Sequence, residues 1–343
     1  MNRFEMTKRV IWSPDEYRLH RIPGIIVTSR GTVIIYNEAR REGQSDWDTI
    51  NIFMQRSEDL GNTFGEPIIL AEGTDEFKTA NNPCMVEDKN GRLHLLYCKD
   101  YTVNGGGAWH RYSDDDGQSW SEPDEVTYAT RPELHNVFAF GPGHAICTAD
   151  GMLLVPVWMV LKEAGVPLHE HMPSVISTFY SKDNGATWQM GEIIPSTKEA
   201  ESPNETVAVE ISDGRIMLDI RSFAHMRSKS FSENGTENWS EPKNDEARLD
   251  PCCFGSVIRF RDGERYRLLA VNCNDEAKRR NITLYVSDDN GQSWSVKRTI
   301  DAERGGYVDI AADEGNGIIY ILYEQTWGKY VFLCRMTADL LEI

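Results

Sequence analysis

The chain has 343 residues, of which 40% are hydrophobic, and a formal net charge of −18. A charge of this sign disfavours nucleic acid, an anionic membrane surface or another polyanion as a partner over a broad surface, whereas cations gathered in one pocket would still bind a small anion. No apolar run is long enough to cross a bilayer, and the first nine residues lack the apolar segment of a signal peptide. We therefore expect a protein that is cytoplasmic as written, or secreted if a signal peptide has been removed.

Cysteine usage does not indicate a disulfide framework or a metal site. The cysteines are odd in number and scattered along the chain without zinc-type pairs. We expect reduced, buried thiols, no structural metal and no cofactor. The seven positions are Cys84, Cys98, Cys147, Cys252, Cys253, Cys273 and Cys334.

In chain order, the first strand-like segment is 8–13, and the second is the apolar run that follows Arg21 within 17–27. A lone arginine is usually a solvated surface group. Pro23 restricts the backbone close to Arg21, and the residues after it are apolar, which favours an innermost strand with Arg21 at its start. Arg21 is therefore the first candidate for a cationic pocket.

The next strand-like run, 50–56, leads into a pattern that recurs along the chain: Ser-x-Asp-x-Gly-x-(Ser/Thr)-(Trp/Phe). An Asp side chain accepts hydrogen bonds from nearby backbone amides, Gly supplies a positive φ, and the aromatic residue packs back over the reversal, so each copy predicts a hairpin turn. In the fourth copy Asn234 replaces the Asp, and Thr236 stands where Gly is expected. The five copies begin at Ser57, Ser113, Ser181, Ser232 and Ser287.

The spacing of these turns predicts the architecture. Successive first serines are 56, 68, 51 and 55 residues apart, a period typical of four-stranded propeller blades. At about 55 residues per blade the chain has room for about six blades. We expect an all-β, six-bladed propeller in a single domain, 1–343, with one blade lacking the turn or closed by the pairing of 8–13 beside 330–336.

Several segments together resemble the sialidase (exo-neuraminidase) family. Arg21-Ile22-Pro23 resembles its Arg-Ile-Pro element, and the repeated turns resemble its Asp-boxes. The segments 81–84 and 141–157 are similar to the starts of its second and third blades. The resemblance runs from about Arg21 to Glu324. Asp-boxes alone indicate only a fold, so a functional prediction depends on site residues.

The resemblance implies three arginines that bind a substrate carboxylate: Arg21, Arg221 and Arg279, of which the last has Arg280 as a neighbour that could be mistaken for it. Guanidinium groups donate paired, charge-assisted hydrogen bonds in a fixed plane that lysines do not reproduce. Glu324 resembles the glutamate that orients the first arginine; the alternative is a solvent-facing glutamate on a strand.

The resemblance also implies the acid/base group. Asp46, in the loop before the first Asp-box strand, matches the proton donor, and Asp48 is the rival, with a local turn role as its alternative. An aspartate that donates a proton near neutral pH needs a raised pKa, which we expect burial in the occupied site, with Trp47 as a neighbour, to supply.

Tyr307 resembles the family's nucleophile, and Glu205 resembles its partner, with Glu210 as the structural member of the same strand. A neutral phenol suits a substrate that carries a carboxylate on its anomeric carbon, because an anionic nucleophile would approach against like charge. The alternative for Tyr307 is a core or channel-lining aromatic residue.

Two other segments carry weaker signals. His169-Glu170-His171 lacks metal-ligand spacing, but it lies in the longest interval between turns, where extra length would form a lid over the site. The run Asn104–Gly107 precedes a strand-like segment, so we expect a hairpin turn there and no phosphate loop.

The sequence as a whole predicts a retaining exo-glycosidase that releases terminal sialic acid from an acidic glycoside. Another nine-carbon keto acid or a uronate as the substrate stays open, as do transfer and intramolecular elimination. A carbohydrate-binding propeller without turnover is the alternative from another class, and it requires neither Tyr307, Glu205 nor Asp46. Nothing in the sequence predicts the oligomeric state.

Overall fold

The computed structural model describes residues 6–100, 107–167 and 170–341. Antiparallel strands dominate it, and the helices among these residues are short 3-10 turns: Thr127–Thr130, Lys162–Ala164 and Ala338–Leu341. The prediction of an all-β chain is therefore confirmed. His169 and most of Asn104–Gly107 lie outside the described residues, so the turn expected at Asn104 stays a prediction.

The strands pair mostly with their neighbours in the chain, in four-stranded antiparallel units. The first unit comprises β2 (Leu19–Val27), β3 (Val33–Arg40), β4 (Ile50–Ser57) and β5 (Ile68–Ala71). The second comprises β6 (Ala80–Glu87), β7 (Leu93–Lys99), β8 (Gly107–Ser113) and β9 (Asp124–Glu125), with β11 (Gly143–His144) parallel to β6. The third comprises β10 (His135–Phe140), β13 (Leu153–Leu161), β14 (Val175–Ser181) and β15 (Gln189–Met190), with β12 (Ile146–Cys147) beside β13.

The later strands form one four-stranded sheet and one larger sheet. The fourth unit comprises β16 (Thr206–Glu210), β17 (Ile216–Ile220), β18 (Met226–Ser232) and β19 (Lys243–Leu249). The larger sheet comprises β20 (Ser256–Asp262), β21 (Arg265–Cys273), β22 (Arg280–Ser287), β23 (Ser295–Asp313), β24 (Ile318–Gln325), β25 (Tyr330–Thr337) and β1 (Thr7–Trp12). Its longest strand, β23, pairs with β22 through its first half and with β24 through its second half.

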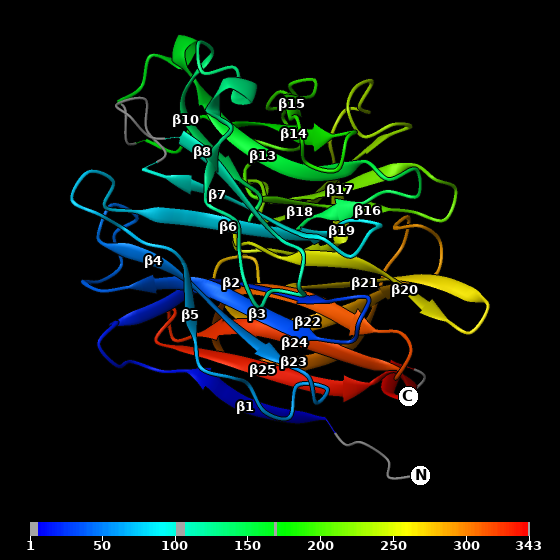
Figure 1. Cartoon of the computed structure of the whole chain (residues 1–343). Coiled ribbons are helices and arrows are strands. Elements are labelled where there is room, and N and C mark those ends of the chain that lie inside the picture. Colours follow the sequence, from blue (N-terminus) through cyan, green and yellow to red (C-terminus); the bar gives the residue numbers. More distant parts are fainter. Residues whose placement is uncertain (1–5, 101–106, 168–169, 342–343) are drawn as a thin grey trace.

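The two ends of the chain meet in one sheet. Strand β1 pairs antiparallel with β25, and Lys8 lies opposite Cys334. In Figure 1 the chain passes from the blue strands through the cyan and green sheets, returns through yellow and orange, and ends with red β25 beside blue β1. The predicted pairing of 8–13 beside 330–336 is confirmed.

The Asp-box turns have the predicted chemistry. In the first copy, the Asp59 carboxylate accepts hydrogen bonds from the Thr63 backbone N–H at 2.8 Å and from the Ser57 hydroxyl at 2.7 Å. Gly61 has a φ of 75°. Hydrogen bonds from Ser119 lower the pKa of the equivalent Asp115 to about 2.

The degraded copy differs from the prediction in where its glycine acts. Gly235, one position before Thr236, has a φ of 74°, and its N–H donates to the Ser232 hydroxyl at 3.0 Å. The Asn234 side-chain oxygen accepts from the Thr236 N–H at 2.9 Å. The turn therefore keeps both elements of the motif, with the positive-φ glycine moved one residue earlier.

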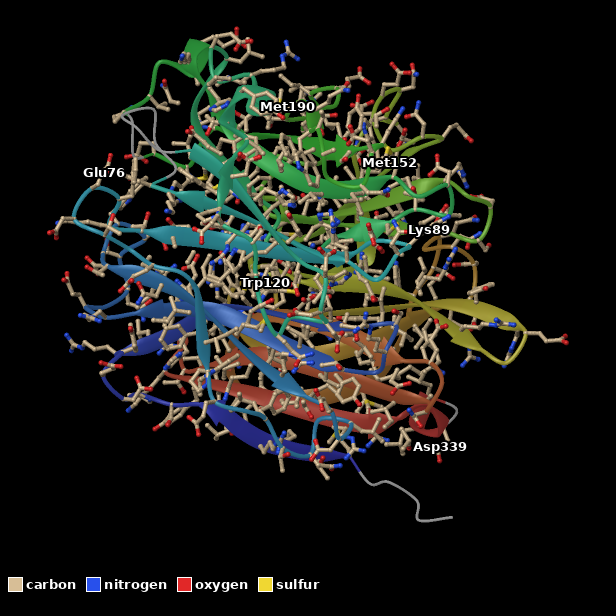
Figure 2. All side chains as sticks on the ribbon, in the orientation of Figure 1. Glu76, Lys89, Trp120, Met152, Met190 and Asp339 are labelled. Carbon is tan, nitrogen blue, oxygen red and sulfur yellow. The ribbon has the colours of Figure 1, made fainter. Side chains whose placement is uncertain are left out.

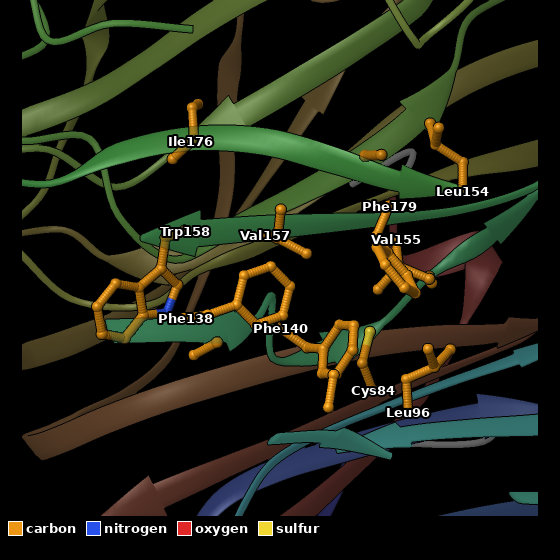
Figure 3. Close-up of a cluster of buried hydrophobic side chains, with 14 of the residues drawn as sticks. Cys84, Leu96, Phe138, Phe140, Leu154, Val155, Val157, Trp158, Ile176 and Phe179 are labelled. Carbon is orange, nitrogen blue, oxygen red and sulfur yellow. The ribbon is translucent and has the colours of Figure 1, made fainter. Parts of the chain in front are cut away.

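Apolar side chains fill the space between neighbouring sheets, so the gaps between ribbons in Figure 1 are occupied (Figure 2). Figure 3 shows the cluster between the second and third units. There the ring of Phe140 packs edge to face against Phe138 and Phe179, at centroid distances of 5.4 and 5.6 Å. All seven cysteines are unpaired, and all except the partly exposed Cys147 are buried, as predicted.

A buried polar junction connects four of the innermost segments. The Asp309 carboxylate accepts from the Ile25 N–H at 2.9 Å, the Ser256 hydroxyl at 2.7 Å and His144 Nδ1 at 2.8 Å. Burial lowers the pKa of His144, but Asp309 outweighs burial and raises it. This junction connects β2, β20 and β23, and both β2 and β23 carry residues that line the pocket described next. In the described part of the chain, no helix is long and apolar enough to cross a membrane.

Candidate active site

One pocket of about 290 Å³ brings together residues from across the chain. Of the predicted site residues, Glu324 alone does not line the pocket; it lies directly behind Arg21, to which it is hydrogen-bonded. Asp48 and Arg280, the two rivals, do not line this pocket; Arg280 is exposed and pairs with Asp275. The predicted residues that line it are Arg21, Asp46, Glu205, Arg221, Arg279 and Tyr307.

Tyr307 and Glu205 are joined by a short hydrogen bond inside the pocket. The Tyr307 hydroxyl donates to Glu205 Oε1 at 2.6 Å, and Arg221 Nη1 donates to the Tyr307 oxygen at 2.9 Å. Arg221 also pairs with the Glu205 carboxylate. Burial, reinforced by Glu205, raises the pKa of Tyr307 well above its ordinary value despite the nearby arginines. The phenol is therefore neutral in the free site, and Glu205 is placed to accept its proton.

Three guanidinium groups surround the ring of Tyr307. The Cζ atoms of Arg21, Arg279 and Arg221 lie 5.2, 5.4 and 6.0 Å from its centroid. Charges of the same sign this close repel one another, so their gathering in one buried pocket requires counter-ions. Glu205 and Glu324 lie within this cluster and supply two of them.

Glu324 is 1% exposed, which excludes the alternative of a solvent-facing glutamate. Its Oε1 accepts from Arg21 Nε at 3.2 Å and from the Ile22 N–H at 2.9 Å. Its Oε2 accepts from the Tyr307 N–H at 3.3 Å. One carboxylate thus fixes both the first arginine and the backbone of the tyrosine.

The Arg-Ile-Pro element turns the backbone so that Arg21 faces the pocket. Ile22 has a φ of 54°, which is uncommon for a β-branched residue, and the pairing of β2 with β3 shifts between Arg21 and Gly24. The second unit repeats the device, because Asn82, before Pro83, has a φ of 49° and also lines the pocket. Strain of this kind is retained where surrounding contacts hold it, as the bond from Ile22 to Glu324 does here.

Asp46 lies at the pocket's edge, and its side chain is 36% exposed. Its Oδ1 is 2.7 Å from Nη1 of the buried Arg40, which also pairs with buried Glu38 at 2.6 Å. Burial raises the pKa of Asp46, but Arg40 and Arg21 outweigh burial and lower it. The carboxylate is therefore ionised in the free site, and the raised pKa expected for the occupied site stays a prediction. The cation beneath Asp46 had no signal in the sequence.

Sequence reasoning missed several residues of the pocket. Trp158 and Trp327 line it without belonging to any motif that the sequence analysis identified, and the same holds for Arg40, which lies behind Asp46. His171 belongs to the interval expected to form a lid, and the structure brings it to the pocket, where its ring centroid lies 5.3 Å from Trp158 and 6.1 Å from Trp47. Burial lowers the pKa of His171 despite the nearby Asp46 carboxylate. The only sequence signal for this side of the pocket was the long interval between the turns that begin at Ser113 and Ser181.

In the part of the chain described, no group of three or more His, Cys, Asp and Glu side chains is arranged to hold a metal ion. What the pocket offers is a neutral phenol beside a carboxylate, a second carboxylate on a buried cation, and three guanidinium groups. This set is able to bind an anion and to exchange protons.

Comparison with known proteins places the chain in a family. The model of the BNR repeat-like domain matches residues 32–321. A sialidase of Paraclostridium sordellii is 25% identical over 338 residues, which cover 89% of this chain and 81% of that protein.

Solved structures of sialidases share the fold, among them the following two. The Hadza microbial sialidase Hz136 has a TM-score of 0.80 at 23% identity, and the match covers 93% of this chain and 66% of that one, so this chain is the shorter. The intramolecular trans-sialidase from Ruminococcus gnavus in complex with oseltamivir carboxylate has a TM-score of 0.79 at 18% identity, and the match covers 98% of both chains. From the family match and these relatives, the chain belongs to the sialidase family of BNR repeat-like domains.

Proposed function

We propose that this protein is a retaining exo-glycosidase that releases terminal sialic acid, or a related sugar with a carboxylate on its anomeric carbon, from glycosides. The observation that carries the proposal is the 2.6 Å hydrogen bond from Tyr307 to Glu205 inside a pocket of three guanidinium groups. The sialidase relatives support the same reaction class.

The arginines bind the substrate carboxylate. In a pocket that excludes most water, charge-assisted hydrogen bonds to one carboxylate offset the mutual repulsion of Arg21, Arg221 and Arg279. Binding at this point places the anomeric carbon, one bond away from the carboxylate, over the phenol of Tyr307.

Tyr307 then attacks the anomeric carbon while Glu205 accepts the phenolic proton. Sialidases are known exceptions to the rule of two catalytic carboxylates and employ a tyrosine nucleophile, and this assignment follows the family. Water later attacks the anomeric carbon from the face that the leaving group has vacated, opposite Tyr307, and the phenol leaves and takes its proton back from Glu205. Two inversions give net retention of configuration.

Asp46 protonates the leaving oxygen and afterwards activates the water. In the free site Arg40 and Arg21 keep the carboxylate ionised. A bound substrate carboxylate neutralises part of the field of Arg21, and the sugar covers the exposed side of Asp46. Both effects raise the pKa of Asp46 when the substrate is present.

We also propose that the sheets form one six-bladed propeller in a single domain, residues 1–343. Counting the two halves of β23 separately gives six four-stranded units among the described strands. The Asp-box glycines of neighbouring units support a closed ring: Gly117 of the second unit lies against Ile34 of the first, and Gly61 of the first lies against Tyr320 of the last.

The first test is release of an aryl group from an aryl sialoside, with a panel that includes the deaminated analogue and uronides. Proton NMR recorded before mutarotation shows which anomer is formed first, and the anomer with the configuration of the substrate indicates retention. An anhydro-sugar product would indicate intramolecular transfer in place of hydrolysis. Tight binding without release at any pH would favour a carbohydrate-binding protein.

Replacing Tyr307 with Phe removes the nucleophile and leaves the ring that the arginines surround. We expect kcat to fall by about 10³-fold or more, because the covalent step is lost while substrate binding is kept. The matched control is Tyr128→Phe, at a tyrosine that is 64% exposed and outside the pocket. A Tyr307→Phe variant that turns over at the normal rate would disprove the nucleophile assignment.

A further inference from the structure

The three arginines of the pocket are held in different ways. Arg21 pairs with Glu324, and Arg221 pairs with Glu205. Arg279 donates through Nη2 to the backbone oxygen of Cys252 at 3.3 Å, and within the described residues no carboxylate oxygen lies at ion-pair distance from it. Something other than a counter-ion must orient this guanidinium.

Two aromatic rings lie beside Arg279. Its Cζ atom is 5.4 Å from the centroid of Tyr307 and 5.4 Å from that of Trp327. The exposed Arg304 lies 4.7 Å from the same indole. A guanidinium near the face of a tryptophan is attracted by the ring quadrupole, and this contact fixes its orientation without neutralising its charge.

Trp327 occupies an unusual backbone position for a large side chain. It lies in the turn between β24 and β25, where Thr326 and Trp327 have φ values of 53° and 59°. Bulky residues rarely adopt this left-handed conformation, which Gly or Asn would adopt at less cost. Such strain at a pocket suggests that the side chain, and not the turn alone, is needed there.

Contacts with the first unit hold this turn in place. The His20 N–H donates to the Gly328 oxygen at 2.8 Å, and Gln44 Nε2 donates to the Trp327 oxygen at 3.2 Å. A Cβ atom added to Gly328 would lie 2.5 Å from Cγ of Arg21, so the turn is packed against the first arginine. The indole is thus fixed relative to both Arg21 and Arg279.

We propose that Trp327 is a positioning residue that holds Arg279 in the orientation that receives the substrate carboxylate. The inference rests on the proposed function of the pocket and adds a role for a residue outside the predicted set. A carboxylate in this place would occupy N–H donors of Arg279, whereas the indole leaves them for the ligand. The competing role for a tryptophan that is 37% exposed at the rim is direct stacking on the leaving group.

A double-mutant cycle separates these roles. The probe is 2,3-didehydro-2-deoxy-N-acetylneuraminic acid, which carries the carboxylate and has no leaving group, with affinity measured by calorimetry. We expect Trp327→Ala to weaken binding by about 3- to 30-fold, the range of a cation–π contact. In an Arg279→Ala background the same change should cost less than about twofold, because the group it positions is gone. Trp327→Phe should restore most of the affinity.

The matched control is Tyr266→Ala, which removes an exposed aromatic ring that also lies near two arginines, Arg259 and Arg261, outside this pocket. It should leave the affinity unchanged. Circular dichroism and thermal melting establish that each variant is folded. Additive losses in the cycle, or a Trp327→Ala variant that binds the probe normally but has a raised KM for glycosides with extended leaving groups, would overturn the positioning role.

A measurement without ligand keeps this inference distinct from the proposed function. In ¹⁵N-labelled protein, the Arg279 Nε–H signal, assigned by its loss in Arg279→Lys, should carry a ring-current shift that disappears in Trp327→Ala. Failure of the wild-type protein to bind the probe would contradict the proposed function. An unchanged Arg279 signal in Trp327→Ala would contradict the positioning role even if the probe binds.

Discussion

At the scale of single residues, the pocket combines charges that would be unfavourable if separated. The phenol of Tyr307 stays neutral because burial and Glu205 raise its pKa, and Arg221 donates to both groups. Asp46 has the opposite environment, since Arg40 holds its carboxylate ionised against burial. In the free site the proposed nucleophile, Tyr307, is therefore neutral and the proposed acid, Asp46, is ionised. Asp46 must gain a proton when the substrate binds before it can act as the acid.

The role of Arg40 gives a prediction on pH dependence. A variant with Arg40→Met and Glu38→Gln removes the cation without leaving Glu38 as an unpaired buried charge. The pKa of Asp46 should rise, so the alkaline limb of kcat/KM, where the proton donor is lost, should move to higher pH by about one to three units. The measurement is a pH profile with the aryl sialoside. A limb that moves to lower pH would contradict the assignment of Asp46 as the acid.

At the scale of elements, the Asp-box turns stabilise hairpins away from the pocket. None of the Asp-box residues described lines it, and their glycines pack against the neighbouring unit, as Gly185 does against His94. Removing the hydrogen bonds within an Asp-box turn should therefore lower the free energy of unfolding and leave the catalytic reaction unchanged.

Replacing Asp183 with Ala removes the acceptor of the Thr187 N–H and hydroxyl bonds. We expect unfolding free energy to fall by about 1–2 kcal/mol, the net worth of one or two hydrogen bonds, with kcat and KM unchanged. Urea denaturation and the aryl sialoside assay measure the two effects. The neighbouring Lys182→Ala is the control, and a loss of activity in folded Asp183→Ala would place the turn in the mechanism.

The histidine pair beneath that turn predicts acid sensitivity. Burial lowers the pKa of His94 to about 4 and that of His110 to about 3, from ordinary values near 6.5. Below pH 6.5 the unfolded chain binds protons that the folded chain does not, so stability falls as the pH falls toward the folded values. Between pH 7 and 5 the loss should approach about 2 kcal/mol per histidine.

Urea denaturation of His110→Phe at pH 7 and pH 5 tests this expectation. The variant should show a smaller loss between the two values than the parent, because one of the two titrating groups is absent. His225→Phe, at an exposed position, should leave the loss unchanged. An equal loss in all three proteins would assign the acid sensitivity to other groups.

At the scale of the whole molecule, the fold brings distant segments to one pocket and closes on itself through its ends. Trp12 of β1 is buried with Ile25 of the first unit and Tyr320 of the last sheet. Strand β1 completes the last sheet, so this apolar cluster joins the beginning and end of the chain.

Trp12→Ala should lower the free energy of unfolding by about 3–5 kcal/mol, as truncation of a large buried aromatic residue does. Val10→Ala, on the same strand but 45% exposed, should cost less than about 1 kcal/mol. Thermal and urea unfolding measure both. A small effect of Trp12→Ala would show that closure through β1 contributes little to stability.

The sequence by itself determined the all-β class and the turn chemistry, because turns and strand alternation depend on residues close together in the chain. It also predicted the pairing of the two ends, because the repeat spacing leaves one unit for them to complete. It also named the residues that the pocket brings together, but only through motifs of a known family. The positions of Arg40 beneath Asp46 and of Trp327 beside Arg279 were decided by tertiary structure alone. Such ion pairs and cation–π contacts depend on how side chains pack in the folded state and leave no pattern in the sequence, and the pair with Arg40 lowers the pKa of Asp46 in the free site.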